Sequence, residues 1–431
     1  MNRSVVQLLV LVGVVAGTWP AGCARQDGED AIVLRVANWG SPAVEQDFMK
    51  VEREIWGEFE RAHPGVTVRV EQIPGLGQYA PKLIMMHVSG SVPDVIHLDA
   101  SSAAVFIDND VLMDLTPFIE RDRSFELDRY FENVVKIARR GDKLYAIPLD
   151  FTPMVMYYNK KLFDDAGVPY PRDGWTWAEF RHAAEKLTVF PQGARHPTQY
   201  GFNFENHMPL WVLWLWTNGG DVLNPDGTRA SGYLDGPASI EAMQFLVGLM
   251  QPANGQAQVA PSLAERAAAG VDLFLDGRAA MDLKGHWMMI NYRARNFDVG
   301  VVTLPTNNIE PVTVIYEAGL SITKLARHPE VAWEFIKYIT SAEVQKRRVA
   351  TGLAISANKQ AADHFAGNPV EDAFLRAVRY ARPPWGARVE TYELCEDLGR
   401  EMMEDIQYSG VPVEEAMRRK AKLMDAVLTE H

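Results

Sequence analysis

The chain has 431 residues, of which 47% are hydrophobic, 10% aromatic and 23% charged, and its formal net charge is -13 at pH 7. This composition is ordinary for a globular protein, and the length predicts two or three domain-sized units. An acidic chain without blocks of Lys and Arg repels nucleic acids and anionic lipid surfaces, which excludes both as partners.

Residues 1–23 have the pattern of a secretory signal: Arg3, a nearly continuous apolar run, then Pro20 and small residues. The run is too short for a permanent membrane span. Ala21-Gly22-Cys23 resembles the end of a bacterial lipoprotein signal, in which Cys23 is lipidated and becomes the N-terminus; an ordinary signal peptide that contains a cysteine is the alternative. We therefore expect an exported protein, periplasmic or at the cell surface. Its only membrane contact would be a lipid anchor at Cys23, followed by a polar tether over residues 24–30.

Cys395 is the only other cysteine, so a disulfide framework is excluded. The sequence contains no CxxC, HExxH or clustered His and Cys, and we predict neither a metal site nor a cofactor. Cys395 lies at helical spacing with Leu398 and Met402, which predicts a buried structural thiol.

Strands and helices alternate from residue 32 onward. Apolar or alternating runs predict strands at 32–38, 66–73 and 93–99, and three- and four-residue spacing predicts helices at 47–63 and 79–88. Such βαβ units form a parallel sheet covered by helices, and ligands bind beyond the carboxyl ends of its strands. Trp39, Asp99 and Ser101 follow strand ends and are therefore candidate ligand contacts.

A second α/β unit begins after residues 145–153, where two prolines flank an extended segment. Thr176 is a predicted helix N-cap, with Glu179 completing a capping box. No repeat, low-complexity tract or long linker interrupts the chain after the tether, so we expect the two units to pack tightly.

The order of motifs resembles the sugar-binding class of bacterial extracellular solute-binding proteins, the receptors of ABC importers. The resemblance covers nearly the whole chain after the signal. It is carried by the segments FERAHPGVTVRVEQIP, VSGSVPDVIHLD, LMDLTPFI, YAIPLDFTPMVMYYNKKLFDDAGVPYP, TWAEF, WTNGGDVLN, FLDGRAAMDLKGHW, DVGVVTLP and GLSITKLARHPEVAWEFIKYITSAEVQ.

This resemblance implies the type II periplasmic-binding-protein fold: α/β, two lobes, each a mainly parallel sheet flanked by helices, with the ligand cleft between the lobes. The implied chain crossings fall near 149–153, 304–311 and 352–358. The implied division is 31–149 and 307–354 for lobe 1, and 150–306 and 355–431 for lobe 2. Hinge closure would signal a bound ligand to membrane permease subunits. We expect a monomer that performs no chemistry.

A sugar receptor needs flat aromatic side chains for the C–H faces of the ring, and carboxylates, amides or Arg for its hydroxyls. The resemblance implies a cleft position for Trp287, for His207 and Trp211 at the start of an apolar helix, and for Trp385 and Arg388 in a later loop. Trp214 and Trp216 are expected in the core. The polar candidates are Asp99, Asp150 and Glu317, which precedes Gly319; a cap or a surface carboxylate is the alternative for each.

Gly285 is expected to let the chain turn so that Trp287 presents its ring to the ligand, and no role is assigned to His286. Asp94, near a strand start, is expected to be structural. Two other functions stay open. The same fold could bind a peptide, a polyamine or an anion, although no Gly-rich loop favours phosphate. A secreted carbohydrate-active enzyme would need two carboxylates facing one bond, and no local catalytic motif supports it.

Overall fold

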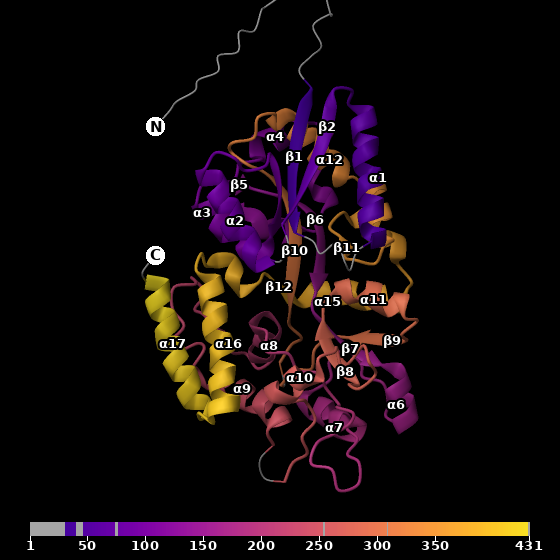
Figure 1. Ribbon diagram of the computed structural model, residues 1–431, viewed down its shortest axis with the longest axis vertical. Coiled ribbons are helices and arrows are strands. Elements are labelled where there is room, and N and C mark those ends of the chain that lie inside the picture. Colours follow the sequence, from indigo (N-terminus) through magenta and orange to yellow (C-terminus); the bar gives the residue numbers. More distant parts are fainter. Residues whose placement is uncertain (1–30, 40–45, 74–75, 253–254, 308, 430–431) are drawn as a thin grey trace, which may run out of the picture.

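The computed structural model describes residues 31–39, 46–73, 76–252, 255–307 and 309–429. The predicted signal peptide, Cys23 and the tether lie outside these residues. Two stacked lobes are visible in Figure 1, with the C-terminal helices along the side of the lower one. Within the described residues, none of the helices combines the length and apolarity that a bilayer crossing requires.

The upper lobe, lobe 1, is built on one mixed sheet with the strand order β11-β6-β10-β3-β1-β2, and β12 pairs with one end of β10. The β1–β2 and β1–β3 pairs are parallel, whereas β10 runs antiparallel to both β3 and β6. The strands are β1 (Ile32–Trp39), β2 (Val66–Ile73), β3 (Val95–Asp99), β6 (Ile147–Pro153), β10 (Thr313–Ile322), β11 (Ile355–Ser356) and β12 (Ala381–Arg382).

The first strands and helices lie where the apolar spacing predicts them. The lobe 1 helices are α1 (Gln46–Ala62), α2 (Leu76–Val88), α3 (Ala103–Asp108), α4 (Thr116–Arg121), α5 (Glu132–Val135), α12 (Pro329–Ile339), α13 (Ala342–Val349) and α14 (Lys359–Ala362), with the 3-10 turns η1 (Ala100–Ser102), η2 (Leu127–Arg129), η3 (Lys136–Ala138) and η5 (Asp363–Phe365) and the hairpin β4 (Arg139–Arg140) and β5 (Lys143–Leu144). Asp94 accepts hydrogen bonds from the backbone N–H groups of Arg35 and Arg327, which confirms its structural role.

The lower lobe, lobe 2, has a three-stranded sheet, β8-β7-β9, formed by β7 (Val155–Asn159), β8 (Met281–Lys284) and β9 (Val299–Val302). Both of its pairs are antiparallel. The α/β class and the two lobes are therefore confirmed, but the expectation of mainly parallel sheets is wrong for lobe 2. The error arises because the strand pattern of the first βαβ units does not continue beyond residue 153.

Alternation along β7 joins the two hydrophobic cores. Val155 and Tyr157 point into the cluster that continues up through lobe 1, while Met156 and Tyr158 point into the cluster that fills lobe 2. This follows from the two-residue period of a strand. Around the sheet lie α6 (Lys160–Ala166), α7 (Trp177–Leu187), α8 (Met208–Trp216), α9 (Pro237–Met250), α10 (Leu263–Ala269), α11 (Met289–Ala294), α15 (Pro369–Ala377), α16 (Tyr392–Ser409) and α17 (Val413–Thr429), with the 3-10 turns η4 (His286–Met288), η6 (Val378–Tyr380) and η7 (Trp385–Arg388).

Helix α8 is apolar on every face, and all nine of its residues are buried. Trp214 and Trp216 are in the core, as predicted, and Gly219 follows the helix with a φ of +75°. Cys395 is fully buried, which confirms a structural thiol. The capping box of Thr176 and Glu179 is also confirmed.

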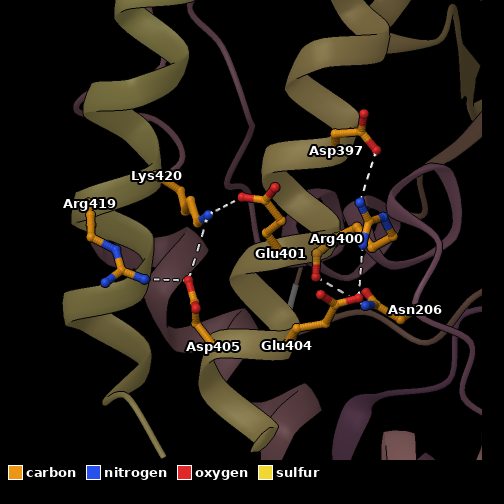
Figure 2. Close-up of polar contacts among 8 residues, drawn as sticks. All are labelled: Asn206, Asp397, Arg400, Glu401, Glu404, Asp405, Arg419 and Lys420. Atoms are coloured by element: carbon orange, nitrogen blue, oxygen red, sulfur yellow. Dashed lines mark hydrogen bonds and ion pairs between the residues drawn. The ribbon is translucent and has the colours of Figure 1, made fainter. Parts of the chain in front are cut away.

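Helices α16 and α17 pack antiparallel and enclose a buried ammonium group. Lys420 is 5% exposed, and its Nζ donates to Glu401 at 2.6 Å and lies 3.6 Å from Asp405. Figure 2 shows that Arg419 also reaches Asp405. On the next face of α16, Arg400 pairs with Asp397 and Glu404. Paired charges thus add to the apolar contacts that hold α16 and α17 together.

The chain passes between the lobes beside Met154, which separates β6 from β7, and again between β9 and β10. Thr313 Oγ1 donates to the Met154 carbonyl at 2.6 Å, so these two crossings are bonded together. Ile355 and Ser356, within the third expected crossing, pair instead with Phe151 and Asp150 of lobe 1. The chain therefore passes to lobe 2 after β11. The exact lobe boundaries stay a prediction.

A buried ion triad joins α1, β6 and α13. Arg348 is 4% exposed; its Nε lies 2.5 Å from Glu52, and its Nη1 lies 3.3 Å from Asp150. Because Arg348 and Glu52 are buried and Asp150 is largely so, removal of one partner leaves the other charges uncompensated.

We expect Arg348→Met to lower the free energy of unfolding by roughly 3–5 kcal/mol, because Glu52 and Asp150 would lose their cation. Urea unfolding at neutral pH measures this. The matched control is Arg347→Met, since Arg347 pairs with Glu58 at the surface, and loss of an exposed pair costs roughly 0–1 kcal/mol. Equal costs for the two variants would contradict the role given to the triad.

Candidate functional site

Three carboxylates come from neighbouring strands in the middle of the lobe 1 sheet. Ala318 on β10 pairs with Asp99 on one side and Asp150 on the other, and Glu317 precedes it. Glu317 is 2% exposed, and neither of its carboxylate oxygens has a hydrogen-bond partner within the described residues. Burial, with the charges of Asp99 and Asp150, raises the pKa of Glu317 well above its usual range. This shift favours the protonated, uncharged form of Glu317.

Gly319 allows Glu317 to lie flat along the strand. A Cβ at position 319 would lie 2.8 Å from Glu317 Oε1 and 2.9 Å from the Ala146 Cβ. Any other residue would push the carboxyl group aside. Gly319 is thus needed for close packing.

Asp99 caps the turn that follows β3. Its Oδ2 accepts the Ser101 backbone N–H at 2.9 Å, and its own carbonyl accepts from Ser102 Oγ at 3.1 Å. Burial raises the pKa of Asp99 to about 6, and the hydrogen bonds from Ser101 and Ser102 oppose that rise. Ser101 is placed beside Asp99, as the strand-end argument predicts.

Asp150 is the third carboxylate and belongs to the Arg348 triad. Burial raises its pKa to about 6, and Arg348 opposes the shift. Its neighbour Thr152 accepts the backbone N–H of His286 at 2.6 Å. This bond ties the first crossing to the segment after β8.

Among the tryptophans that the structure describes, Trp287 is the one whose indole remains substantially open, with 36% of its surface exposed. Gly285, before it, has φ -92° and ψ 178°, an extended conformation available to any residue. The expectation that glycine is needed for a turn is therefore wrong. The actual reason is contact: a Cβ on Gly285 would lie 2.1 Å from Trp287 Cζ3, so the indole rests on the glycine backbone.

His286 points inward between these two residues. It is 2% exposed, its Nε2 lies 2.7 Å from Glu371 Oε2, and its ring meets Phe374 edge-on. Arg293 donates to the other oxygen of Glu371 at 2.7 Å. His286 thus anchors the turn to α15, while Trp287 points away.

The remaining candidates lie in different surroundings. Trp39 is half-buried and packs edge-on against Tyr79 and His97, with ring centroids 5.2 and 5.4 Å apart. His207 is exposed at the start of α8. Trp211 is 1% exposed, and its Nε1 has no hydrogen-bond partner among the described residues. It packs beside Gly399 of α16.

Trp385 is 2% exposed and meets Tyr392 edge-on, so its ring lies inside lobe 2 in this structure. Arg388 lies in η7, but its side chain is outside the described part of the chain. The structure therefore brings together Asp99, Ser101, Asp150, Glu317 and Gly319, whereas Trp211 and Trp385 are inaccessible in it.

Two residues near the carboxylates were missed by the sequence analysis. Tyr316 donates its hydroxyl to the Pro209 carbonyl at 3.0 Å, which joins β10 to the start of α8. Burial, with the charge of Asp99, raises the pKa of Glu396 on α16 to about 8. Glu396 lies one helical turn after Tyr392, and this spacing is the sequence feature that could have identified it. No feature of the sequence pointed to Tyr316.

The site contains no metal-binding set: no group of three or more His, Cys, Asp or Glu within the described ranges could hold an ion. The arrangement offers acids, a hydroxyl and an open indole. These groups suit recognition of a polar ring.

Comparison with known proteins gives a consistent result. The model of the bacterial extracellular solute-binding protein family matches residues 42–346. The chain is 24% identical over 352 residues to the multiple sugar-binding protein of Streptococcus mutans, covering 75% of this chain and 74% of that protein. It is 29% identical over 190 residues to an uncharacterized lipoprotein of Streptomyces antibioticus, covering 43% of this chain and 40% of that protein.

The fold agrees with these relatives. An ABC substrate-binding protein of Listeria monocytogenes, solved in complex with cycloalternan, has a TM-score of 0.80 and 24% sequence identity, covering 93% of this chain and all of that chain. The family match extends over well more than half of the sequence and includes the strands that carry Asp99, Asp150 and Glu317. The chain therefore belongs to the family of bacterial extracellular solute-binding proteins.

Proposed function

We propose that this protein is an extracytoplasmic receptor that captures a sugar or oligosaccharide between its lobes and delivers it to the permease of an ABC importer. The observation that carries the proposal is Trp287, an open indole at the carboxyl end of β8 that rests on Gly285. A flat apolar face of this kind covers the C–H face of a sugar ring. The relative that binds multiple sugars supports the same ligand class.

The carboxylates supply the polar half of recognition. Asp99 and Asp150, which are partly exposed, accept hydrogen bonds from ligand hydroxyls, and Glu317 lies buried beside them with a raised pKa that favours its protonated form. Lobe closure brings lobe 2 groups such as His207 toward them. A non-sugar solute such as a peptide or a polyamine remains the alternative ligand.

The carboxylates do not suit hydrolysis. Asp99 is used as a cap, Asp150 is paired with Arg348, and Glu317 is enclosed by the sheet. A glycosidase needs two carboxyl groups that face one open bond. We therefore propose a binding protein without catalytic activity. From the sequence alone, we also propose that it is exported as a monomer and anchored through Cys23.

A screen of mono- and oligosaccharides tests the function. We expect the correct sugar to change tryptophan fluorescence and to raise the melting temperature, since a ligand that binds only the folded state stabilises it. Trp287→Ala should weaken binding by about 1 kcal/mol, roughly fivefold in Kd, through loss of a stacked ring. The control Phe190→Ala removes another exposed aromatic of lobe 2 and should change neither value. No response to any sugar, or steady release of hydrolysed product, would overturn the proposal.

Gly285→Ala tests how the indole is held. The new methyl group would occupy the position of the Trp287 ring and should displace it. We expect sugar affinity to fall about as far as in Trp287→Ala, with the overall fold retained, because the backbone conformation at position 285 suits alanine. Near-UV circular dichroism and sugar titration measure the two effects. Gly57→Ala on α1 is the control, and wild-type affinity in Gly285→Ala would show that the ring is placed by other contacts.

Glu317→Gln tests the neutral state of the buried acid. Its raised pKa means that the unfolded chain loses this proton first as pH rises, so the contribution of Glu317 to stability falls with pH. Gln does not titrate. We therefore expect the unfolding free energy of Glu317→Gln, relative to wild type, to rise as pH increases above about 4.3, the ordinary pKa of Glu, by up to ~1.4 kcal/mol per pH unit. Urea unfolding without ligand measures it, and a difference that is constant with pH would mean that Glu317 is ionised in the folded protein.

A further inference from the structure

A second groove lies between the lobes, away from the carboxylates and Trp287. Its volume is about 750 Å³, and none of the ligand contacts predicted from the sequence lines it. Lys136 and Arg140 reach it from lobe 1, Trp216 and Tyr233 from lobe 2, and Arg382 from β12. Small-molecule sites are commonly hollows of this size.

The charged groups around this groove are mainly basic, although the chain as a whole is acidic. Asp221 is the carboxylate among its lining residues, and both of its oxygens are occupied. Oδ1 accepts from Trp216 Nε1 and the Val222 N–H, both at 2.8 Å, and Oδ2 accepts from Arg382 at 2.6 Å. The Arg382 guanidinium carbon also lies over the Trp216 ring, 3.5 Å from its centroid. The negative charge of Asp221 is thus compensated within the wall.

The positive charge of Arg140 is not balanced by a carboxylate in the wall of the groove. Its guanidinium donates to the carbonyls of Ile137, Arg139 and Ala387 at 3.2, 3.0 and 2.7 Å, all neutral acceptors. None of the ion pairs in the described part of the chain includes it. Partial burial lowers the pKa of Arg140, although the nearby Asp108 opposes this. A partly desolvated cation with neutral partners favours an anion beside it.

The start of α9 adds positive potential to the same wall. Gly236, the N-cap residue, provides no side chain to accept from the first backbone N–H groups of this 14-residue helix, and Gly236, Pro237, Ala238 and Ser239 line the groove. The first N–H groups of a helix have no partner within the helix, and together with the helix dipole they favour a negative charge there. This feature reinforces the basic side chains.

We propose that this interlobe groove is a second binding site, which takes a small solute with a carboxylate or sulfate group. Arg140, Arg382 and exposed Lys136 hold the anionic group, and Tyr233 lines the space for the rest of the molecule. Lys136 also pairs with Glu132 at the surface, so it contributes least. Because the walls belong to both lobes, a bound anion stabilises their present arrangement. The groove shares no lining residue with the proposed sugar site.

Calorimetric titration of the sugar-free protein with sodium sulfate, against sodium chloride at equal ionic strength, tests the site. We expect saturable binding of sulfate and a rise in melting temperature. Arg140→Gln and Arg382→Gln should each weaken the apparent Kd at least ~tenfold, as loss of a charge-assisted bond does. The control is Lys143→Gln, which removes an exposed cation from the same hairpin but outside the groove. Titration with glucuronate and with glucose then separates an acidic sugar from a free anion.

Two results would overturn the proposal: sulfate binding that does not saturate, or binding equal in the control and both groove variants. Arg140 also supports the Ala387 carbonyl, so its variant is first checked for wild-type circular dichroism. If the Arg140→Gln variant does not fold, Arg382→Gln and Lys136→Gln test the proposal instead. We then expect sulfate affinity to fall less in Lys136→Gln than in Arg382→Gln. Sugar-induced fluorescence at Trp287 should be unchanged in every groove variant, which keeps this outcome separate from that of the proposed function.

Discussion

The antiparallel pairing of β6 with β10 is the constraint on which the rest of the structure depends. These two strands run side by side through the lobe 1 sheet and toward lobe 2, where the bond from Thr313 to Met154 holds them together. The same pairing puts Asp150 and Glu317 on adjacent strands, and β3 adds Asp99 on the other side of β10. The pairing of β6 with β10 therefore supports both the chain crossings between the lobes and the group of carboxylates. A change of register by one residue would turn these side chains to the opposite face.

Burial of several carboxylates in one place is costly, and the protein reduces the cost in three different ways. Asp150 gains the cation Arg348, Asp99 accepts the backbone N–H of Ser101, and the raised pKa of Glu317 favours its uncharged form. A core selected for stability alone would place apolar residues at these positions, because well-packed hydrophobic groups are often the more stable choice. Perturbed acids concentrated on neighbouring strands of one sheet are better explained by ligand recognition.

The sequence predicts periodic features well and contact-dependent features poorly. The strands from β1 to β3, the capping box at Thr176 and the buried Cys395 follow from local spacing, and the structure confirms them. The antiparallel lobe 2 sheet could not be predicted, since strand direction there depends on pairs separated by more than a hundred residues. Gly285 shows the same limit, because its role comes from a ring two residues away rather than from its own φ and ψ.

The tryptophans show why composition alone cannot locate a site. Trp211, Trp214 and Trp216 share one short helix, and because that helix is apolar on every face the surrounding helices bury all three. Trp287 follows a strand of only four residues, and the preceding side chain, His286, turns inward to Glu371. The buried His286 fixes the backbone, and Gly285 provides a flat support. An indole held in this way loses little conformational freedom when a ligand stacks on it, so more of the stacking energy is available for binding.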